Sequence, residues 1–285
     1  MKQFQINIFI VFSILYLSDC GTTKIAQTYI NPQIYSLDDT SRFVCVYQFK
    51  FLFDTIKMIY KEDLNVIKIG DVFTKSYCYQ TNYIDSLWNN MEGGRIFWAN
   101  QIYDAVVNKK GDVGLWQKGP YQFYIYKDYQ KEIITVRDHV SSYPFIYEEE
   151  LKPQDWIIME DTTDILGYSC QKAKCTFRSR DWIAWFTPEI PISEGPYKFY
   201  GLPGLIMKLQ DNESHYSFEI NEFKKTNELI NVTIYKSDKQ IDRLSLLKLL
   251  MNRTGTDLTA IQSAKIGIVA SSDTKHYDHI ERDYK

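Results

Sequence analysis

The sequence lacks an excess of basic charge: 33 lysine and arginine residues face 36 aspartate and glutamate residues, and the formal net charge is −3. Proteins that bind nucleic acid normally present a basic field to the phosphate backbone. We therefore expect no nucleic-acid partner. The 285-residue sequence also lacks low-complexity linkers, blocks of like charge and internal repeats, so one domain over residues 27–285 is the simplest organisation.

Histidine is scarce, and familiar catalytic motifs are absent. The sequence contains four histidines and has no Gly-x-Ser-x-Gly elbow, His-Glu-x-x-His pair or phosphate-binding glycine loop. His276, Asp278 and His279 could supply metal ligands, but a tetrahedral site needs further donors from elsewhere. We therefore expect no metal and no cofactor, and the sequence identifies no catalytic residue. His139 and His215 stay as general-base candidates if the protein is a hydrolase.

A hydrophobic run long enough to span a membrane is also missing. Ile6 to Leu17 is an almost unbroken apolar run of twelve residues that follows the positive charge of Lys2, whereas a spanning helix needs about 20 residues. This pattern is typical of a secretory signal peptide. We expect a signal peptide over residues 1–20, with cleavage between 19 and 26. The alternative is a buried N-terminal strand or helix.

The end of this segment leaves two routes of export open. Residues 17–20 resemble a lipoprotein cleavage box with Cys20 as the lipid acceptor, although Asp19 stands where a small residue is expected. Cleavage after Ala26 would place Lys24 at an unfavourable position. We expect an exported protein that is periplasmic, associated with the outer membrane or secreted. A lipid on Cys20 would be its only attachment to a membrane.

Four further cysteines are disulfide candidates: Cys45, Cys78, Cys170 and Cys175. An even number in an exported chain permits disulfides. Cys170 and Cys175 lie in one predicted strand about 17 Å apart, which exceeds the limit of about 7 Å for a bridge. Bridges would therefore tie this strand to Cys45 and Cys78. The alternative is four reduced, buried thiols.

Aromatic residues are abundant, at 15% of the chain, and they favour pleated sheets over helical bundles. Tyr216, Phe218 and Ile220 alternate with polar residues, as in an antiparallel sheet with one face toward water. The predicted strands are Phe43–Phe53, Val66–Gln80 with a break near Gly70, Leu115–Tyr126, Glu132–Arg137, Leu166–Arg178, Trp182–Thr187, Leu205–Gln210, Tyr216–Phe223 and Asn231–Tyr235.

Two segments have helical patterns. The first is Arg95–Asn108, and the second carries the stripe Ile241, Leu244, Leu247 and Met251 after a capping box of Ser237 and Gln240. The sequence therefore predicts a mainly β (α+β) fold. We expect a curved antiparallel sheet or half-open barrel with one or two helices packed on one side.

Proline and glycine are concentrated in residues 182–209. Pro188, Pro191 and Pro196 remove backbone donors and predict an ordered, extended loop between two strands. Pro203 and Gly204 fit the central positions of a type II turn over residues 202–205, because glycine accepts the positive φ that this turn needs. We expect this loop to close one side of a recess.

The same region resembles the GLPGLI family of exported bacterial proteins. Its signature occurs here as Gly201, Leu202, Pro203, Gly204, Leu205 and Ile206, and segments 167–173, 177–180, 184–192 and 195–199 also match in order. Ser179 replaces a usual glycine, and the match is weaker upstream and at the C-terminus. The resemblance implies a cell-envelope protein of uncharacterised function, and it supplies no catalytic residues.

Arginines and aromatic residues near this loop are the candidate ligand-binding residues, since a guanidinium can stack on indole or bind a carboxylate. They are Arg178, Arg180, Trp182, Trp185, Tyr197 and Phe199. In the alternative interpretation the tryptophans belong to the core and the arginines pair with Glu189 and Glu194.

The sequence therefore favours a noncatalytic binding or accessory module of the cell envelope. An aromatic and apolar recess would take an apolar or peptide ligand. A hydrolase of envelope peptides or glycans is the alternative, and it requires His139 or His215 within hydrogen-bond reach of a carboxylate and a nucleophile. A third hypothesis is a component of an outer-membrane transporter, which requires a large exposed apolar patch.

Overall fold

A computed structural model describes residues 32–112, 115, 120–140, 143–235, 237–251 and 278–284. The predicted signal peptide, its cleavage site, the lipidation candidate Cys20 and His276 lie outside the described residues. Within the described part of the chain, no helix has the length and apolar character needed to cross a membrane.

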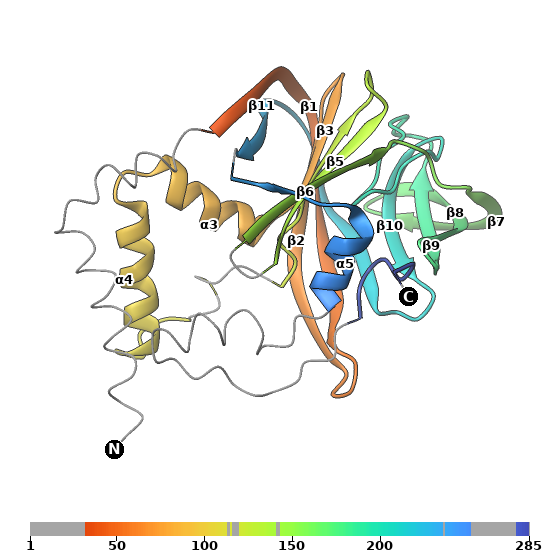
Figure 1. Cartoon of the computed structure of the whole chain (residues 1–285). Helices are drawn as coiled ribbons and strands as arrows, with labels where there is room; N and C mark the ends of the chain where they lie inside the picture. The colour runs from red at the N-terminus through yellow and green to blue at the C-terminus, as the bar shows by residue number, and fades with distance from the viewer. Residues whose placement is uncertain are drawn as a thin grey trace.

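The described strands form one 12-stranded sheet, in the order β12-β6-β5-β4-β3-β2-β1-β11-β10-β9-β8-β7 (Figure 1). Every pairing is antiparallel except the short parallel contact of β12 with β6. The prediction of a mainly β fold with an antiparallel sheet is confirmed. The strands are β1 (Pro32–Asp54), β2 (Ile59–Ile69), β3 (Phe73–Cys78), β4 (Tyr124–Asp128), β5 (Ile133–Val140), β6 (Tyr143–Glu150), β7 (Ile157–Ile165), β8 (Tyr168–Phe177), β9 (Arg180–Thr187), β10 (Leu205–Asp211), β11 (Tyr216–Tyr235) and β12 (Lys239–Gln240).

Three helices are described: α3 (Tyr79–Asn90), α4 (Gly94–Val106) and α5 (Arg243–Met251). α3 follows β3 directly, α4 packs against α3, and α5 contacts β6 (Figure 1). The helix predicted from Arg95 is confirmed as α4. The predicted capping box is wrong, because Gln240 belongs to β12 and the Asp242 carboxylate instead accepts the Ser245 amide at 2.9 Å.

Aromatic side chains on one face of β1 and β11 make the main core. Tyr47, Phe49 and Phe51 alternate along β1 and are at most 1% exposed. The Phe49 ring stacks on Phe218 of β11, with a centroid distance of 4.4 Å. Register shifts between β1 and β11 add local twist to these long strands. The main core therefore lies on the face of the sheet that carries these aromatic residues.

The GLPGLI segment differs from the predicted type II turn. The Gly204 amide donates to the Leu202 carbonyl at 2.8 Å, and the Leu205 amide donates to the Ile190 carbonyl at 3.0 Å. The backbone thus makes a three-residue turn at Leu202–Gly204, and the Leu205 amide pairs with a neighbouring segment instead of with Leu202 as in a type II turn. Glycine is required at 204 because a Cβ there would lie 2.1 Å from the carbonyl oxygen of Thr187. The leucines and Ile206 of the motif are buried in the main core.

Cys45, Cys78, Cys170 and Cys175 are all free and buried. The expected disulfides are therefore absent, and the alternative of four reduced thiols describes the structure. The strand order explains why: β11, β10 and β9 separate β1 from β8 in the sheet, and neighbouring strands are about 4.8 Å apart. Burial raises the pKa of each of these thiols, to about 12 for Cys175.

Candidate functional site

Most of the predicted ligand-binding residues lie around one short segment of the same chain, residues 278–284, which we call the C-terminal segment. Arg180 and Tyr197 donate to it directly, as does Arg178 from the turn between β8 and β9. Trp182 and Phe199 pack against each other in the core below, with ring centroids 4.7 Å apart.

Trp185 is not part of this group. The pairing of β9 with β8 is regular, so Trp185 lies on the opposite face of β9 from Trp182. Its ring is partly buried, and the Lys172 ammonium lies 5.7 Å from the ring centroid. The structure thus places one of the six predicted residues away from the others.

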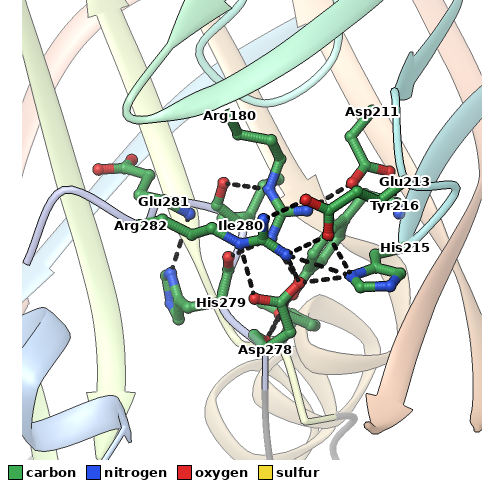
Figure 2. Close-up of polar contacts among 11 residues, drawn as sticks. Arg180, Asp211, Glu213, His215, Tyr216, Asp278, His279, Ile280, Glu281 and Arg282 are labelled. Carbon is green, nitrogen blue, oxygen red and sulfur yellow. Dashed lines mark hydrogen bonds and ion pairs between the residues drawn. The ribbon is translucent and has the colours of Figure 1, made fainter. Parts of the chain in front are cut away.

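Arg180 is the centre of the first half of the site, and Figure 2 shows its contacts. The residue is 3% exposed. Its guanidinium pairs with Asp211 of β10 and with Asp278, the latter at 2.5 Å. It also donates to the carbonyl oxygens of His279 at 2.9 Å and Ile280 at 3.3 Å. Nε and Nη2 thus bind the C-terminal segment, while Nη1 binds Asp211 of the sheet.

His215 lies beside this contact, in a group of charges at the end of the β10–β11 hairpin (Figure 2). Its Nδ1 is 2.8 Å from Asp278 and 3.2 Å from Glu213. Arg282 binds both oxygens of Glu213 at 2.6 Å and reaches Asp278 at 2.8 Å. Burial alone would raise the pKa of Asp278, but hydrogen bonds from Arg282 and Arg180 outweigh it and hold the pKa well below its usual range. The hydrogen bonds from Arg282 likewise lower the pKa of Glu213.

The second half of the site is a buried ion pair between Lys198 and Glu281. Both side chains are fully buried, and Lys198 Nζ is 2.6 Å from Glu281 Oε1. Lys198 also contacts Glu149 at 2.6 Å and Tyr147 at 2.8 Å, while the Tyr197 hydroxyl donates to Glu281 at 2.7 Å. Burial opposes the ionised form of Glu281, but Lys198 more than compensates and lowers its pKa to about 2.

Two further arginines, Arg243 and Arg178, bind the C-terminal segment. Arg243, at the start of α5, donates to Glu281 and to Asp283 at 2.6 Å each. Arg178 pairs with Asp283 at 3.3 Å and accepts the Arg282 amide on its carbonyl oxygen. The alternative interpretation pairs Arg178 and Arg180 with Glu189 and Glu194. The ion pairs among the described residues do not include these pairings, and Glu194 instead pairs with Lys127 at 2.8 Å.

The residues that sequence reasoning missed are Glu281 and Asp283 of the C-terminal segment and their basic partners Lys198 and Arg243, while Asp278 was considered only as a metal ligand. Asp278, Glu281 and Asp283 alternate with residues of other types at the end of the sequence. Ile280, which lies among them, is 2% exposed and belongs to the main core. The predicted recess therefore holds a segment of the chain itself.

Asp211, Glu213 and His215 bring potential metal-ligand atoms within 4.8 Å of one another. The carboxylate oxygens are already engaged: Asp211 accepts from Arg180 and from the Tyr216 amide, and both oxygens of Glu213 accept from arginine. A cation would have to displace a guanidinium. This donor set does not fit a metal, and we assign none.

An open pocket lies where the C-terminal segment meets the sheet. Its cavity volume is about 30 Å³, so it is a shallow hollow that is open to solvent. Aromatic rings and carboxyl groups line it together, a composition that suits ligands with both apolar faces and hydrogen-bonding groups. The lining residues are Phe51, Leu52, Phe53, Pro120, Tyr121, Asp138, Leu250, Met251, Asp278 and His279.

Residues 78–247 match the model of a protein family described as N-glycanase peptide, N-terminal domain. Among solved structures, two of PNGF-II in different space groups are similar to 75% of this chain, at 15% identity and TM-scores of 0.49 and 0.46. The chain spans about a third of the length of these structures. No curated protein matches the chain.

Proposed function

The chain belongs to the family of the N-glycanase peptide N-terminal domain, and we propose that it is a noncatalytic accessory domain that binds N-glycosylated peptide or protein for a glycan-cleaving enzyme. The matched residues run from the end of β3 into α5 and include most of the basic residues that hold the C-terminal segment. The family name connects the domain with an N-glycanase, and the substrate of such an enzyme is the natural ligand for an accessory domain.

The pocket beside the C-terminal segment is the observation that carries the proposal. The half-buried rings of Phe53 and Tyr121 line its wall, with Tyr121 edge to face against the buried Phe51 at a centroid distance of 4.8 Å, and Asp138 adds a carboxyl group. The C–H face of a sugar ring packs on an aromatic ring, and sugar hydroxyls donate to carboxylates. The cavity volume of about 30 Å³ is well below the roughly 300 to 1,000 Å³ of enclosed small-ligand sites, so a sugar would bind across the open mouth of the pocket.

The charge state of the His215 group supports binding over catalysis. Cleavage of a glycosidic or amide bond at neutral pH requires a general acid, and a carboxyl group serves as one when its pKa is raised. Asp278 and Glu213, which contact His215, both have lowered pKa values. These carboxylates stay ionised and act as anchors for arginine.

Binding can be measured by calorimetry with an N-glycopeptide and with the same peptide after removal of its glycan. We expect the glycopeptide to bind and the bare peptide to bind at least about tenfold more weakly, since the sugar would supply most of the buried contacts. Phe53→Ala should reduce the affinity, because Phe53 lines the pocket. Phe223→Ala is the matched control, since Phe223 is also partly buried but stacks on Phe43 elsewhere in the sheet.

Equal binding of the two peptides would refute the proposal. Mass spectrometry of the same mixtures tests the hydrolase alternative, which the His215–Asp278 distance of 2.8 Å keeps open. Release of the glycan by the wild-type chain, abolished in His215→Gln, would replace an accessory role with a catalytic one.

Export and membership of the GLPGLI family remain part of this proposal. The apolar run of residues 6–17 and the motif at residues 201–206 support them. Mass spectrometry of the mature protein should find an N-terminus between residues 19 and 27, with or without a lipid on Cys20. An intact N-terminus in the envelope fraction would contradict cleavage.

A further inference from the structure

The hairpin turn between β1 and β2 carries an exposed apolar group that neither the core nor the candidate site uses. We call residues 54–61 the β1–β2 tip. Ile56 is 68% exposed, Met58 54% and Ile59 42%. Lys57 and Lys61 in the same turn are exposed as well. In Figure 1 the hairpin extends past the neighbouring strands, so the tip lies at an extremity of the sheet.

The tip has a defined conformation that holds these side chains outward. The Asp54 carboxylate accepts the amides of Ile56 at 3.0 Å and Lys57 at 2.8 Å. Met58 has a φ of +50°, a left-handed conformation that is uncommon for a residue with a side chain. The strands pair up to the contact of Asp54 with Ile59. A strained, preorganised turn is a feature found at binding sites.

The size and shape of the tip favour a lipid surface over a protein partner. A specific protein interface buries about 800 Å² on each side, which a projecting turn of a few residues cannot supply alone. Insertion into the headgroup and acyl boundary of a bilayer needs only a few apolar side chains with basic residues beside them.

The charge around the tip indicates the kind of lipid. Lys57 lies between Ile56 and Met58 in the sequence, and Lys61 follows Ile59 and Tyr60. Lys50 lies nearby with its ammonium 5.1 Å from the Tyr60 ring centroid, opposite the exposed Glu62, so the exposed lysines outnumber the exposed carboxylate. The Asp54 carboxylate is turned toward backbone amides. Basic side chains beside a membrane-inserted apolar group bind anionic lipid headgroups.

We propose that the β1–β2 tip inserts into the surface of an anionic membrane, with Ile56, Met58 and Ile59 at the acyl boundary and Lys57 and Lys61 at the headgroups. This contact is separate from a lipid on Cys20, and it adjoins the pocket beside the C-terminal segment, because Lys61 lies 3.9 Å from the ring centroid of the pocket residue Phe53. It would hold the domain against a membrane with the β1–β2 hairpin pointing toward the lipid.

The test places a polarity-sensitive fluorophore on the tip of the full chain, so that the signal reports this contact and not the N-terminal segment. Ile56→Cys carries the label in a Cys20→Ser background, where the four described thiols are buried. Ile157→Cys on β7 is the matched control, because Ile157 is 58% exposed. The vesicles contain phosphatidylcholine alone or with phosphatidylglycerol.

We expect a blue shift at position 56 with the anionic vesicles and no shift at position 157. Lys57→Glu with Lys61→Glu should raise the lipid concentration needed for half of the shift about tenfold or more, and 0.5 M salt should act in the same direction. No shift at 56, equal shifts at both positions, or a shift that ignores lipid charge would overturn the proposal. A blue shift that appears when a second protein is added, but not when vesicles are added, would also overturn the proposal, because it would identify a protein as the partner.

Discussion

Glu281→Gln isolates the contribution of the buried ion pair that holds the C-terminal segment. The substitution keeps the shape of the side chain and removes its charge, which leaves Lys198 with Glu149 as its remaining acidic partner. Burial raises the pKa of Glu281, but Lys198, with Tyr197 and Arg243, outweighs burial and lowers the pKa from 4.5 to about 2. This difference is equivalent to roughly 3 kcal/mol of stability at neutral pH, near the lower end of the 3–5 kcal/mol expected when one partner of a buried pair is removed.

The pH dependence has a definite sign. Because the folded pKa lies below the unfolded one, ionised Glu281 stabilises the protein fully above pH 4.5, and this stabilisation is lost as the pH falls toward 2. At pH 3 about half of it remains. The stability difference between wild type and Glu281→Gln should therefore narrow from roughly 3 kcal/mol at pH 7 to about 1.5 kcal/mol at pH 3.

Urea unfolding of both proteins at the two pH values measures this difference. Lys198→Met and the double variant complete a thermodynamic cycle, and the double variant should lose less than the sum of the single ones because neither charge is left alone. Asp283→Asn is the control, since Asp283 binds the same Arg243 but is partly exposed. A loss below about 1 kcal/mol for Glu281→Gln, or a difference independent of pH, would refute the role of the pair.

Three further predictions test the structure around the site. Gly204→Val should lower the free energy of unfolding by about 2–4 kcal/mol, because its Cβ would clash with the Thr187 carbonyl; an unchanged melting temperature would contradict the close approach. Trp182→Ala should cost about 3–5 kcal/mol and Trp185→Ala clearly less, since only Trp182 is fully buried; equal losses would argue against their placement on opposite faces. The four described thiols should resist a thiol reagent until the protein unfolds, because they are buried and their pKa values are raised; loss of stability on adding a reductant would instead indicate disulfides.

Local sequence pattern was enough to predict an antiparallel sheet, parts of most of its strands and the helix at α4. It missed β6 and β7, and of the described residues in the predicted strand Leu115–Tyr126 only those from Tyr124 belong to a strand. It was not enough for α3, where the predicted strand Val66–Gln80 ends at Cys78 and a helix begins at Tyr79. Aromatic and β-branched residues in Tyr79–Asn90 are compatible with either structure. In the structure α3 contacts β2, β3 and α4. A local sequence pattern cannot predict such tertiary contacts.

The turn at the GLPGLI motif shows a different limit. Proline and glycine correctly indicated a break between β9 and β10, but the turn type depends on which carbonyl is nearest to the Leu205 amide. That carbonyl belongs to Ile190, fifteen positions earlier in the sequence. Glycine at 204 is therefore explained by a backbone passing close to its Cα, and not by the positive φ of a type II turn.

At the candidate site, residue type indicated binding groups, but contacts distant in the sequence decided their partners. Residue type identified Arg178, Arg180 and Tyr197 as groups that bind something, but their partners are distant in sequence: Arg180 and Asp278 are 98 positions apart. Because these donors are saturated by the C-terminal segment, an external ligand has two options. It displaces the segment against the buried Lys198–Glu281 pair, or it binds beside the segment. The open pocket has Asp278 and His279 in its wall, so the segment itself supplies part of the binding surface, and the second option requires no ion pair to break.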